Sequence, residues 1–186
     1  MNDPIFKNVV HALRFSFDRN RIGLSRPSVN RMAAPSGQGD CSLAGLDGAA
    51  QAGMIRSEVQ RLGQTVESVL LARFAPQRLG CGCQRLCCCG YIENPEWVGS
   101  LRVLADHAKQ ELGLNPAQHC LPIDVVRRYF TGQVNIQDLA KRNSVSRNTA
   151  GHYNSRIGRE LRLLESRSIQ LVEDRLSSLG LLMPEK

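Results

Sequence analysis

Apolar residues recur at helical spacing in several separate segments of the chain. Residues 5–18 follow the spacing of a short amphipathic helix, and the same pattern returns over 49–74 and 95–113. Pro76 follows the second of these segments, as expected of a residue that cannot continue a helix. Residues 122–180 carry an almost unbroken helical pattern, and no segment alternates with the period of a strand. The pattern therefore predicts a mainly α protein.

The stretch between the first two helical segments has a different character. Residues 22–50 lose all periodicity and gain proline, glycine and serine. Because a loop of that length is unusual inside a compact domain, we expect an extended arm. The chain then divides into an N-terminal helix and arm over 1–50, a helical region with a Cys-rich segment over 51–120, and a C-terminal region over 121–186 that ends in a long helix.

The segment Ile136–Ile157, which reads IQDLAKRNSVSRNTAGHYNSRI, has the pattern of two helices joined by a tight turn. Asn135 and Ser146 each stand where a residue that caps a helix N-terminus is expected. Ser144 lies in the turn, at a position where glycine is usual. This is the arrangement in which one helix braces a second that enters the DNA major groove. The buried side of the second helix is predicted to hold Val145, Ala150, Tyr153 and Ile157.

The opposite side of this second helix carries side chains that suit DNA. Arg147 and Asn148 lie in its first turn, and they can form paired hydrogen bonds with guanine and adenine edges, respectively. Gly151 has no side chain to hold the helix away from the groove. The other predicted DNA-binding residues are His152 and Ser155 on the same face, Ser146 and Thr149 for phosphates at the helix N-terminus, and Arg156 and Arg159 for the backbone further along.

The charge of the chain strengthens this interpretation. Lys and Arg number 24 against 17 Asp and Glu, which gives a formal net charge of +7 and favours a polyanionic partner such as nucleic acid. Residues 124–162 hold eight basic and three acidic residues, and we expect Arg127 and Arg128 to form an exposed basic edge on a helix over Pro122–Phe130. The alternatives are a solvated basic face, a helical hairpin with a structural role and, for His152, an ordinary surface histidine.

Five of the seven cysteines lie in the segment CGCQRLCCCG, residues 81–90. The N-terminus has no secretory signal pattern, so we expect a cytoplasmic, reducing location, where clustered thiols are more often metal ligands than disulfides. Zinc prefers four ligands, and thiolates from a glycine-containing turn can supply them. The alternative is a buried or redox-active thiol patch. A zinc knuckle over 81–89 is predicted to use Cys81, Cys83, Cys87 and Cys88, with Cys89 as a substitute and Cys120, His119 and His107 as more distant candidates.

Other classes of protein find no support in the sequence. No run of 18 apolar residues is present, so we expect no membrane span. The chain has no Walker phosphate loop, no dinucleotide-binding glycine pattern and no clustered carboxylate pair. None of the four histidines lies in a recognisable catalytic motif. We therefore do not expect an enzyme.

A cysteine cluster followed by a basic helix-turn-helix resembles phage late-gene regulators of the antitermination Q type. The resemblance covers residues about 60–160 and depends on CGCQRLCCCG and IQDLAKRNSVSRNTA, although the compact cysteine spacing differs from the paired dithiols of well-known members. It implies a protein of the phage-infected bacterial cytoplasm that binds a DNA element near a late promoter and engages RNA polymerase and sigma factor. It also implies that Arg147, Asn148 and His152 read DNA, while the N-terminal half and the zinc knuckle face polymerase.

Together these patterns predict a mainly α helical bundle with a small Cys-rich zinc knuckle and a C-terminal helix-turn-helix. The predicted function is a DNA-binding transcription regulator that acts as a monomer or homodimer. The alternative is a phage DNA-packaging protein similar to a terminase small subunit, because such proteins also pair a helix-turn-helix with helices that form oligomers. Ring-like oligomers in solution would favour that alternative.

Overall fold

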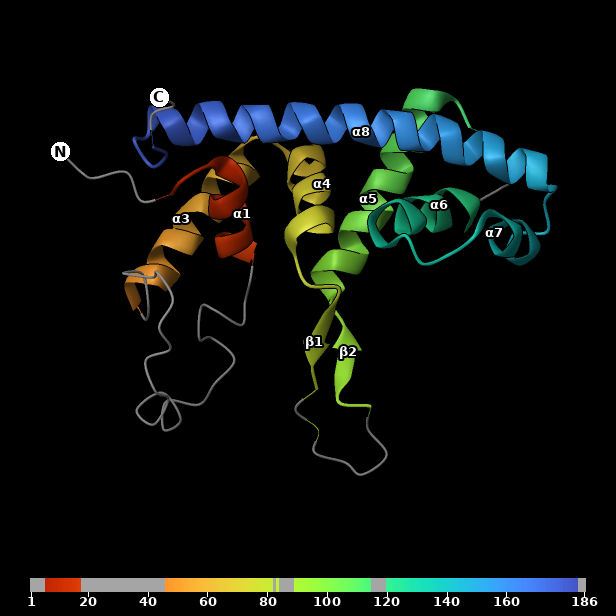
Figure 1. The fold of residues 1–186 in the computed structure, drawn as a ribbon, viewed down its shortest axis with the longest axis horizontal. Helices are drawn as coiled ribbons and strands as arrows, with labels where there is room; N and C mark the ends of the chain where they lie inside the picture. The colour runs from red at the N-terminus through yellow and green to blue at the C-terminus, as the bar shows by residue number, and fades with distance from the viewer. Residues whose placement is uncertain (1–5, 18–45, 82, 84–88, 115–119, 184–186) are drawn as a thin grey trace.

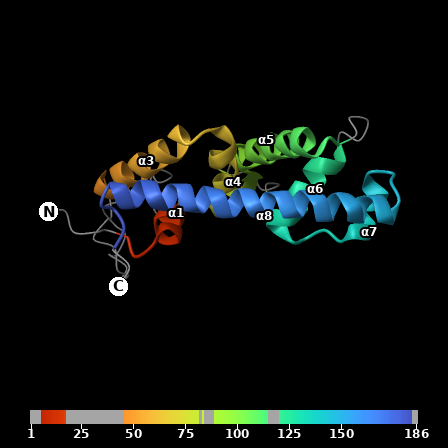
Figure 2. The same ribbon diagram turned by 90° about the horizontal axis from the view of Figure 1, so that it is seen from above.

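The computed structural model describes residues 6–17, 46–81, 83, 89–114 and 120–183. Most of these residues are helical, which confirms the mainly α class. The long helix α8 (Arg147–Ser178) runs along the whole molecule, and most other elements lie below it in the view of Figure 1, while the C-terminal end of α5 reaches past it. Seen from above, α3 and α5 lie on one side of α8, and α1 and α7 lie on the other (Figure 2). The remaining helices are α1 (Val9–Phe17), α3 (Leu46–Arg61), α4 (Gln64–Phe74), α5 (Pro95–Leu112), α6 (Cys120–Thr131) and α7 (Ile136–Arg142).

Local sequence signals set the ends of α5. The side chain of Asn94 accepts a hydrogen bond from the backbone N–H of Glu96 at 3.1 Å, with Pro95 in the first turn. At the other end, Gly113 adopts a left-handed conformation with φ 55°, which a glycine reaches without strain. The helix predicted over 95–113 is therefore confirmed almost to the residue.

The single helix predicted over 49–74 is wrong, because the chain breaks into α3 and α4 at Gly63. This glycine has φ 106°, a value that an α-helix cannot contain. The break redirects the chain so that α4 packs against α5 and α8, while α3 packs against α1. The apolar positions on both sides of the break keep helical spacing, so their pattern did not reveal the change of direction.

The expectation that no strand forms also needs correction. β1 (Arg78–Gly80) pairs antiparallel with β2 (Tyr91–Glu93), with Arg78 opposite Glu93 and Gly80 opposite Tyr91. Each strand has three residues, which is too short to produce a visible alternation. The two strands extend away from the helices (Figure 1), and the cysteine-rich segment 81–90 lies between them in the sequence.

The described helices share one hydrophobic core. It contains residues from every helix, including the fully buried Leu13, Leu70 and Leu161. Trp97 at the start of α5 is 2% exposed, and its indole N–H donates to the backbone carbonyl of Ala72 in α4 at 3.1 Å. The three regions expected from the sequence therefore meet in one core. Residues 22–45 of the predicted arm lie outside the described part, and the expectation that the arm extends to residue 50 is wrong, because α3 already begins at Leu46. No described helix combines the length and apolarity needed to cross a bilayer.

Two ion pairs fix α8 to the helices beneath it. Arg73 of α4 binds both carboxylate oxygens of Glu165, and Tyr129 of α6 donates its hydroxyl to Glu165 Oε2 at 3.1 Å. Near the C-terminal end of α8, Arg175 binds Glu58 of α3 at 2.7 Å. The hydrogen bond from Arg175 holds the pKa of the Glu58 carboxyl below its usual value. These contacts join segments that are distant along the chain.

Candidate nucleic-acid interface

The N-terminal caps predicted for α7 and α8 are both present. The Asn135 side chain accepts from the Asp138 N–H at 2.8 Å, and the Ser146 hydroxyl accepts from the Thr149 N–H at 3.0 Å. Each cap satisfies one of the backbone donors that a helix N-terminus leaves without an internal partner. These two hydrogen bonds fix the residues at which α7 and α8 begin.

The turn between α7 and α8 has the hydrogen bonds of a Schellman motif. The Val145 N–H donates to the Ala140 carbonyl at 3.0 Å, and the Ser144 N–H donates to the Lys141 carbonyl at 3.2 Å. Ser144 has φ 53° and is the one non-glycine residue with positive φ in the described part of the chain. Serine therefore occupies the left-handed position that usually carries glycine, and the turn keeps its shape.

The turn is also held from outside. The amide of Asn143 donates to the carboxylate of Asp124 in α6 at 2.9 Å and to the Leu139 carbonyl at 3.0 Å. Because one side chain contacts both α6 and the end of α7, it fixes the position of the turn relative to α6. The N-terminus of α8 is thereby held in place by its neighbours.

The predicted inner side of α8 is buried. Ala150 and Ile157 are 0% exposed, Tyr153 is 8% exposed, and Val145 is half-buried at the junction. The small Ala140 and the larger Leu139 of α7 are buried as well. The prediction of an inner side at these positions is therefore confirmed, and the opposite side of α8 is left to solvent.

Most of the predicted DNA-binding residues lie on that outer side. Adding a Cβ at Gly151 would meet no atom within 4 Å, so the surface above this residue is open. Thr149 and Gly151 are half-buried. The exposed members of the predicted set are Ser146, Arg147, Asn148, His152, Ser155 and Arg159.

Arg156 differs from the rest of the predicted set. Its side chain is half-buried, and its Nη2 donates to the backbone carbonyl of Leu112 at 2.8 Å. This carbonyl belongs to the last turn of α5, where helix carbonyls lack internal partners and attract cations. One amino group of Arg156 is therefore engaged within the protein, so Arg156 contributes less to the candidate interface than the spacing suggested.

The basic edge expected on α6 needs a correction. Arg127 is half-buried, binds Glu93 of β2 at 2.7 Å and lies over the ring of Trp97. Arg128 points toward α8 instead, where its Nη1 donates to Asn154 Oδ1 at 3.4 Å. The two neighbouring arginines therefore serve different surfaces, because adjacent positions on a helix face about 100° apart.

Sequence reasoning missed a groove that Arg128 helps to form. It lies between α6 and α8 and has a volume of about 550 Å³. Arg162 lines this groove. The sequence signal that could have identified Arg162 is its spacing of three residues from Arg159, which places both on one helix face. The residues that line the groove are Arg128, Tyr129, Gly132, Asn154, Ser155, Gly158, Arg159 and Arg162.

The predicted zinc ligands are only partly within the described residues. The Cys81 N–H donates to the Gly90 carbonyl at 2.9 Å and extends the hairpin by one pair. Cys89 is exposed, and its thiol donates to the Tyr91 carbonyl at 3.2 Å. Cys83 is exposed too, whereas Cys87, Cys88 and His119 lie outside the described part. The described residues form no group of three or more metal-ligating side chains.

The more distant zinc candidates lie on other elements. Cys120 is exposed and begins α6, and His107 of α5 lies 4.0 Å from the carboxylate of Glu160 in α8. The hairpin, by contrast, brings Cys81 and Cys89 to the same end of its two strands through the Cys81–Gly90 pairing.

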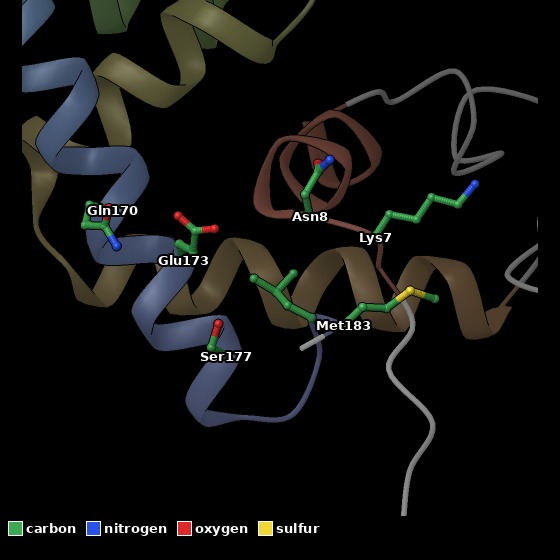
Figure 3. A pocket seen from close by; sticks show the side chains of 7 residues that line it. Lys7, Asn8, Gln170, Glu173, Ser177 and Met183 are labelled. Carbon is green, nitrogen blue, oxygen red and sulfur yellow. The ribbon is translucent and has the colours of Figure 1, made fainter. Parts of the chain in front are cut away.

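A second hollow lies near the two ends of the described chain. Its volume is about 520 Å³, and Figure 3 shows Glu173 and Ser177 of α8 opposite Lys7 and Asn8 at the start of α1. Gln170 also lines it and donates to Asp174 at 3.0 Å. The described residues that line this hollow include one lysine and one carboxylate but no thiol or imidazole.

No related protein guides the interpretation of the outer side of α8. The chain was compared with models of protein families, with curated proteins and with solved structures, and none of them matched. The outer side of α8 is therefore described by its own residues, which are exposed polar groups at its N-terminus and arginines further along it.

Proposed function

We propose that the protein binds double-stranded DNA, with α7 and the first turns of α8 acting as a helix-turn-helix. The observation that carries the proposal is the position of Arg147 and Asn148. Both are exposed in the first turn of α8, while Ala150 and Tyr153 on the opposite side are buried. In helix-turn-helix proteins, the N-terminal residues of the second helix contact base edges in the major groove.

The N-terminus of α8 also suits phosphate. Ser146 and Thr149 place hydroxyl groups 2.9 Å apart at the first turn, beside the backbone N–H groups that a helix N-terminus directs outward. The positive end of the helix dipole attracts anions at this point. We therefore assign Ser146 and Thr149 to positioning on the DNA backbone, and Arg147, Asn148 and His152 to contacts with bases.

The experiment that tests DNA binding is selection of bound duplexes from a random library at two salt concentrations. We expect enrichment of a defined sequence that persists at the higher salt, because base contacts depend less on counterion release than phosphate contacts do. Enrichment that disappears between about 50 mM and about 200 mM salt would indicate a solvated basic face that attracts any polyanion, and would contradict the proposal.

The proposal extends to transcription regulation of the kind that the Q-type resemblance implies. It is supported by the separation of two surfaces, since the strands that flank the cysteine-rich segment extend away from the helices and lie apart from the N-terminal turn of α8 that we assign to DNA (Figure 1). One surface could hold DNA while the other contacts RNA polymerase and sigma factor. Transcription in vitro through a terminator on a template that carries the selected DNA sequence tests this role. Unchanged read-through with bound protein would contradict it.

We also propose that the hairpin cysteines bind a structural zinc ion. The support is the chemistry of the donor set, because several thiols at a glycine-containing hairpin end match the ligands that structural zinc prefers. Protein purified without chelator should contain about one zinc per chain, and removal of the zinc should lower its thermal stability. A zinc content below about half an equivalent would contradict the site.

A further inference from the structure

The groove between α6 and α8 is strongly basic. Arg128 enters it from α6, and Arg159 and Arg162 enter it from α8. None of the described residues that line the groove is acidic. The nearby carboxylate of Glu165 is neutralised by Arg73 and also accepts the Tyr129 hydroxyl. The three guanidinium groups therefore face the same groove without a carboxylate between them.

Arg128 has donors to spare within this groove. Its Nε is buried and has no hydrogen-bond partner among the described residues, and its Nη1 makes one long contact with Asn154. The Nε is shielded from solvent, so the donors that a ligand in the groove can use are those of the two amino groups, which make only the one long contact with Asn154 within the described part of the chain. The planar guanidinium group matches phosphate oxygens with two parallel donors, which a single point charge does not.

The position of the groove along α8 also suits contact with a DNA phosphate. Arg159 lies eleven positions beyond Asn148, which at 1.5 Å per residue is about 16 Å along the helix. Asn148, Ser155, Arg159 and Arg162 follow one another at helical spacing on one face. The DNA major groove is about 12 Å wide, so a helix whose first turn contacts bases has passed the edge of that groove at Arg159. At that edge runs the phosphate backbone.

We propose that the groove between α6 and α8 binds a backbone phosphate of the DNA, next to the base pairs that α8 contacts. This inference rests on the proposed function. It assigns Arg128 and Arg162 to DNA, in addition to Arg159, and it makes α6 part of the interface. Tyr129 and Gly158 shape the groove, since Tyr129 Cδ2 would lie 3.9 Å from a Cβ added at Gly158. A free phosphate ion presents the same chemistry, and the experiment separates the two sources.

The test compares Arg128→Gln and Arg162→Gln with Arg167→Gln, which removes an exposed charge of α8 outside the groove. Each groove variant should bind every duplex about tenfold more weakly than wild type, with unchanged sequence preference. The slope of log affinity against log salt should become shallower by about one. Arg167→Gln should bind like wild type. Replacing Arg128 could unfold the protein. Arg162 is exposed, so its replacement leaves the fold intact and still tests the groove.

Neutral methylphosphonate groups then locate the phosphate. Placed one at a time along the duplex, one of them should weaken wild-type binding about tenfold and have little effect on Arg128→Gln, because the two changes remove the same contact. Groove variants that match Arg167→Gln in affinity and salt slope would overturn the inference and leave the proposed function standing. If inorganic phosphate shifts the NMR signal of the Arg128 Nε–H but the wild-type protein binds no duplex, both the inference and the proposed function are overturned.

Discussion

At the scale of single residues, the carboxylate of Glu165 has two partners from different helices. Arg73 of α4 binds both of its oxygens, and Tyr129 of α6 donates to Oε2 at 3.1 Å. The guanidinium group of Arg73 also lies over the rings of Tyr129 and Phe130. This small network joins α4 and α6 to the middle of α8, and it lies directly behind the groove that we assign to phosphate.

Replacing Tyr129 with phenylalanine tests the hydrogen bond within this network. We expect Tyr129→Phe to lower the free energy of unfolding by about 1.5–3 kcal/mol, because the ring is kept and one hydrogen bond to a charged group is lost. Urea denaturation measures the difference. Tyr91→Phe is the matched control, since Tyr91 is 45% exposed and should change stability little. Equal effects of the two changes would show that the Tyr129 hydroxyl contributes nothing.

The same residue predicts a pH dependence. Burial and the charge of Glu165 raise the pKa of Tyr129 from 10.0 to about 12. The folded state therefore keeps this proton while the unfolded state loses it, so stability falls as pH rises from about 10 to about 12. Melting temperatures measured across this range should converge for wild type and Tyr129→Phe, which lacks the titrating group. Parallel curves for the two proteins would contradict the shift.

Residues whose partners are close in sequence could be predicted, and residues with distant partners could not. Asn135 and Ser146 cap helices through contacts within three residues, so the sequence alone identified both. Arg127 binds a residue 34 positions away, and Arg156 binds one 44 positions away. The charge of each was visible in the sequence. The partner of each arginine depends on how the helices pack against one another, and no local sequence pattern indicates that packing.

At the scale of elements, the turn between α7 and α8 depends on a serine in a left-handed conformation. Ser144 has φ 53°, which costs an L residue about 1–2 kcal/mol relative to glycine. The compensation is the pair of hydrogen bonds that close the end of α7. The turn therefore holds α8 against α7 despite the unfavourable residue, which explains why the departure from glycine does not alter the geometry.

Ser144→Gly should therefore stabilise the protein. We expect a gain of about 0.5–1 kcal/mol, because relief of the left-handed strain exceeds the added entropy of a glycine in the unfolded chain. Ser166→Gly in the exposed middle of α8 is the control and should cost about 0.5 kcal/mol. Thermal melts of both variants give the signs directly. A loss of stability in Ser144→Gly would contradict the role assigned to this turn.

The elements themselves were only partly predictable. α5 could be read from the chain because its capping residues and its apolar spacing agree. The break between α3 and α4 and the three-residue strands could not. Gly63 inside a helical pattern is compatible with either a continuous or a broken helix, and strands as short as β1 and β2 carry no periodicity.

At the scale of the whole molecule, α8 forms the common support of the fold. It packs against every other described helix and contributes Ile157, Leu161, Val172 and Leu176 to the core. The helix predicted to follow the turn therefore packs onto its own chain along its buried side. Because the N-terminal turns of this same helix carry Arg147 and Asn148, the proposed DNA-contacting side chains stand on the most extensively supported element of the structure.

Truncating a core residue of α8 should therefore affect the whole fold. Leu161 is 0% exposed at the centre of the helix, and we expect Leu161→Ala to cost about 2–5 kcal/mol through the cavity that it leaves. Leu163→Ala is the control, because Leu163 is 50% exposed and its loss should change stability by less than about 0.5 kcal/mol. Chemical denaturation should show a single cooperative transition for both. Separate transitions for the two ends of α8 would contradict a shared core.

The most direct test of the central claim is the sequence preference of Arg147→Ala in duplex selection, compared with wild type and Arg167→Ala. We predict that Arg147→Ala binds the wild-type site more weakly by about 1–3 kcal/mol and loses preference at one or two base pairs, while Arg167→Ala keeps the wild-type preference. If Arg147→Ala keeps both the affinity and the base preference of the wild-type protein, the first turn of α8 does not read DNA.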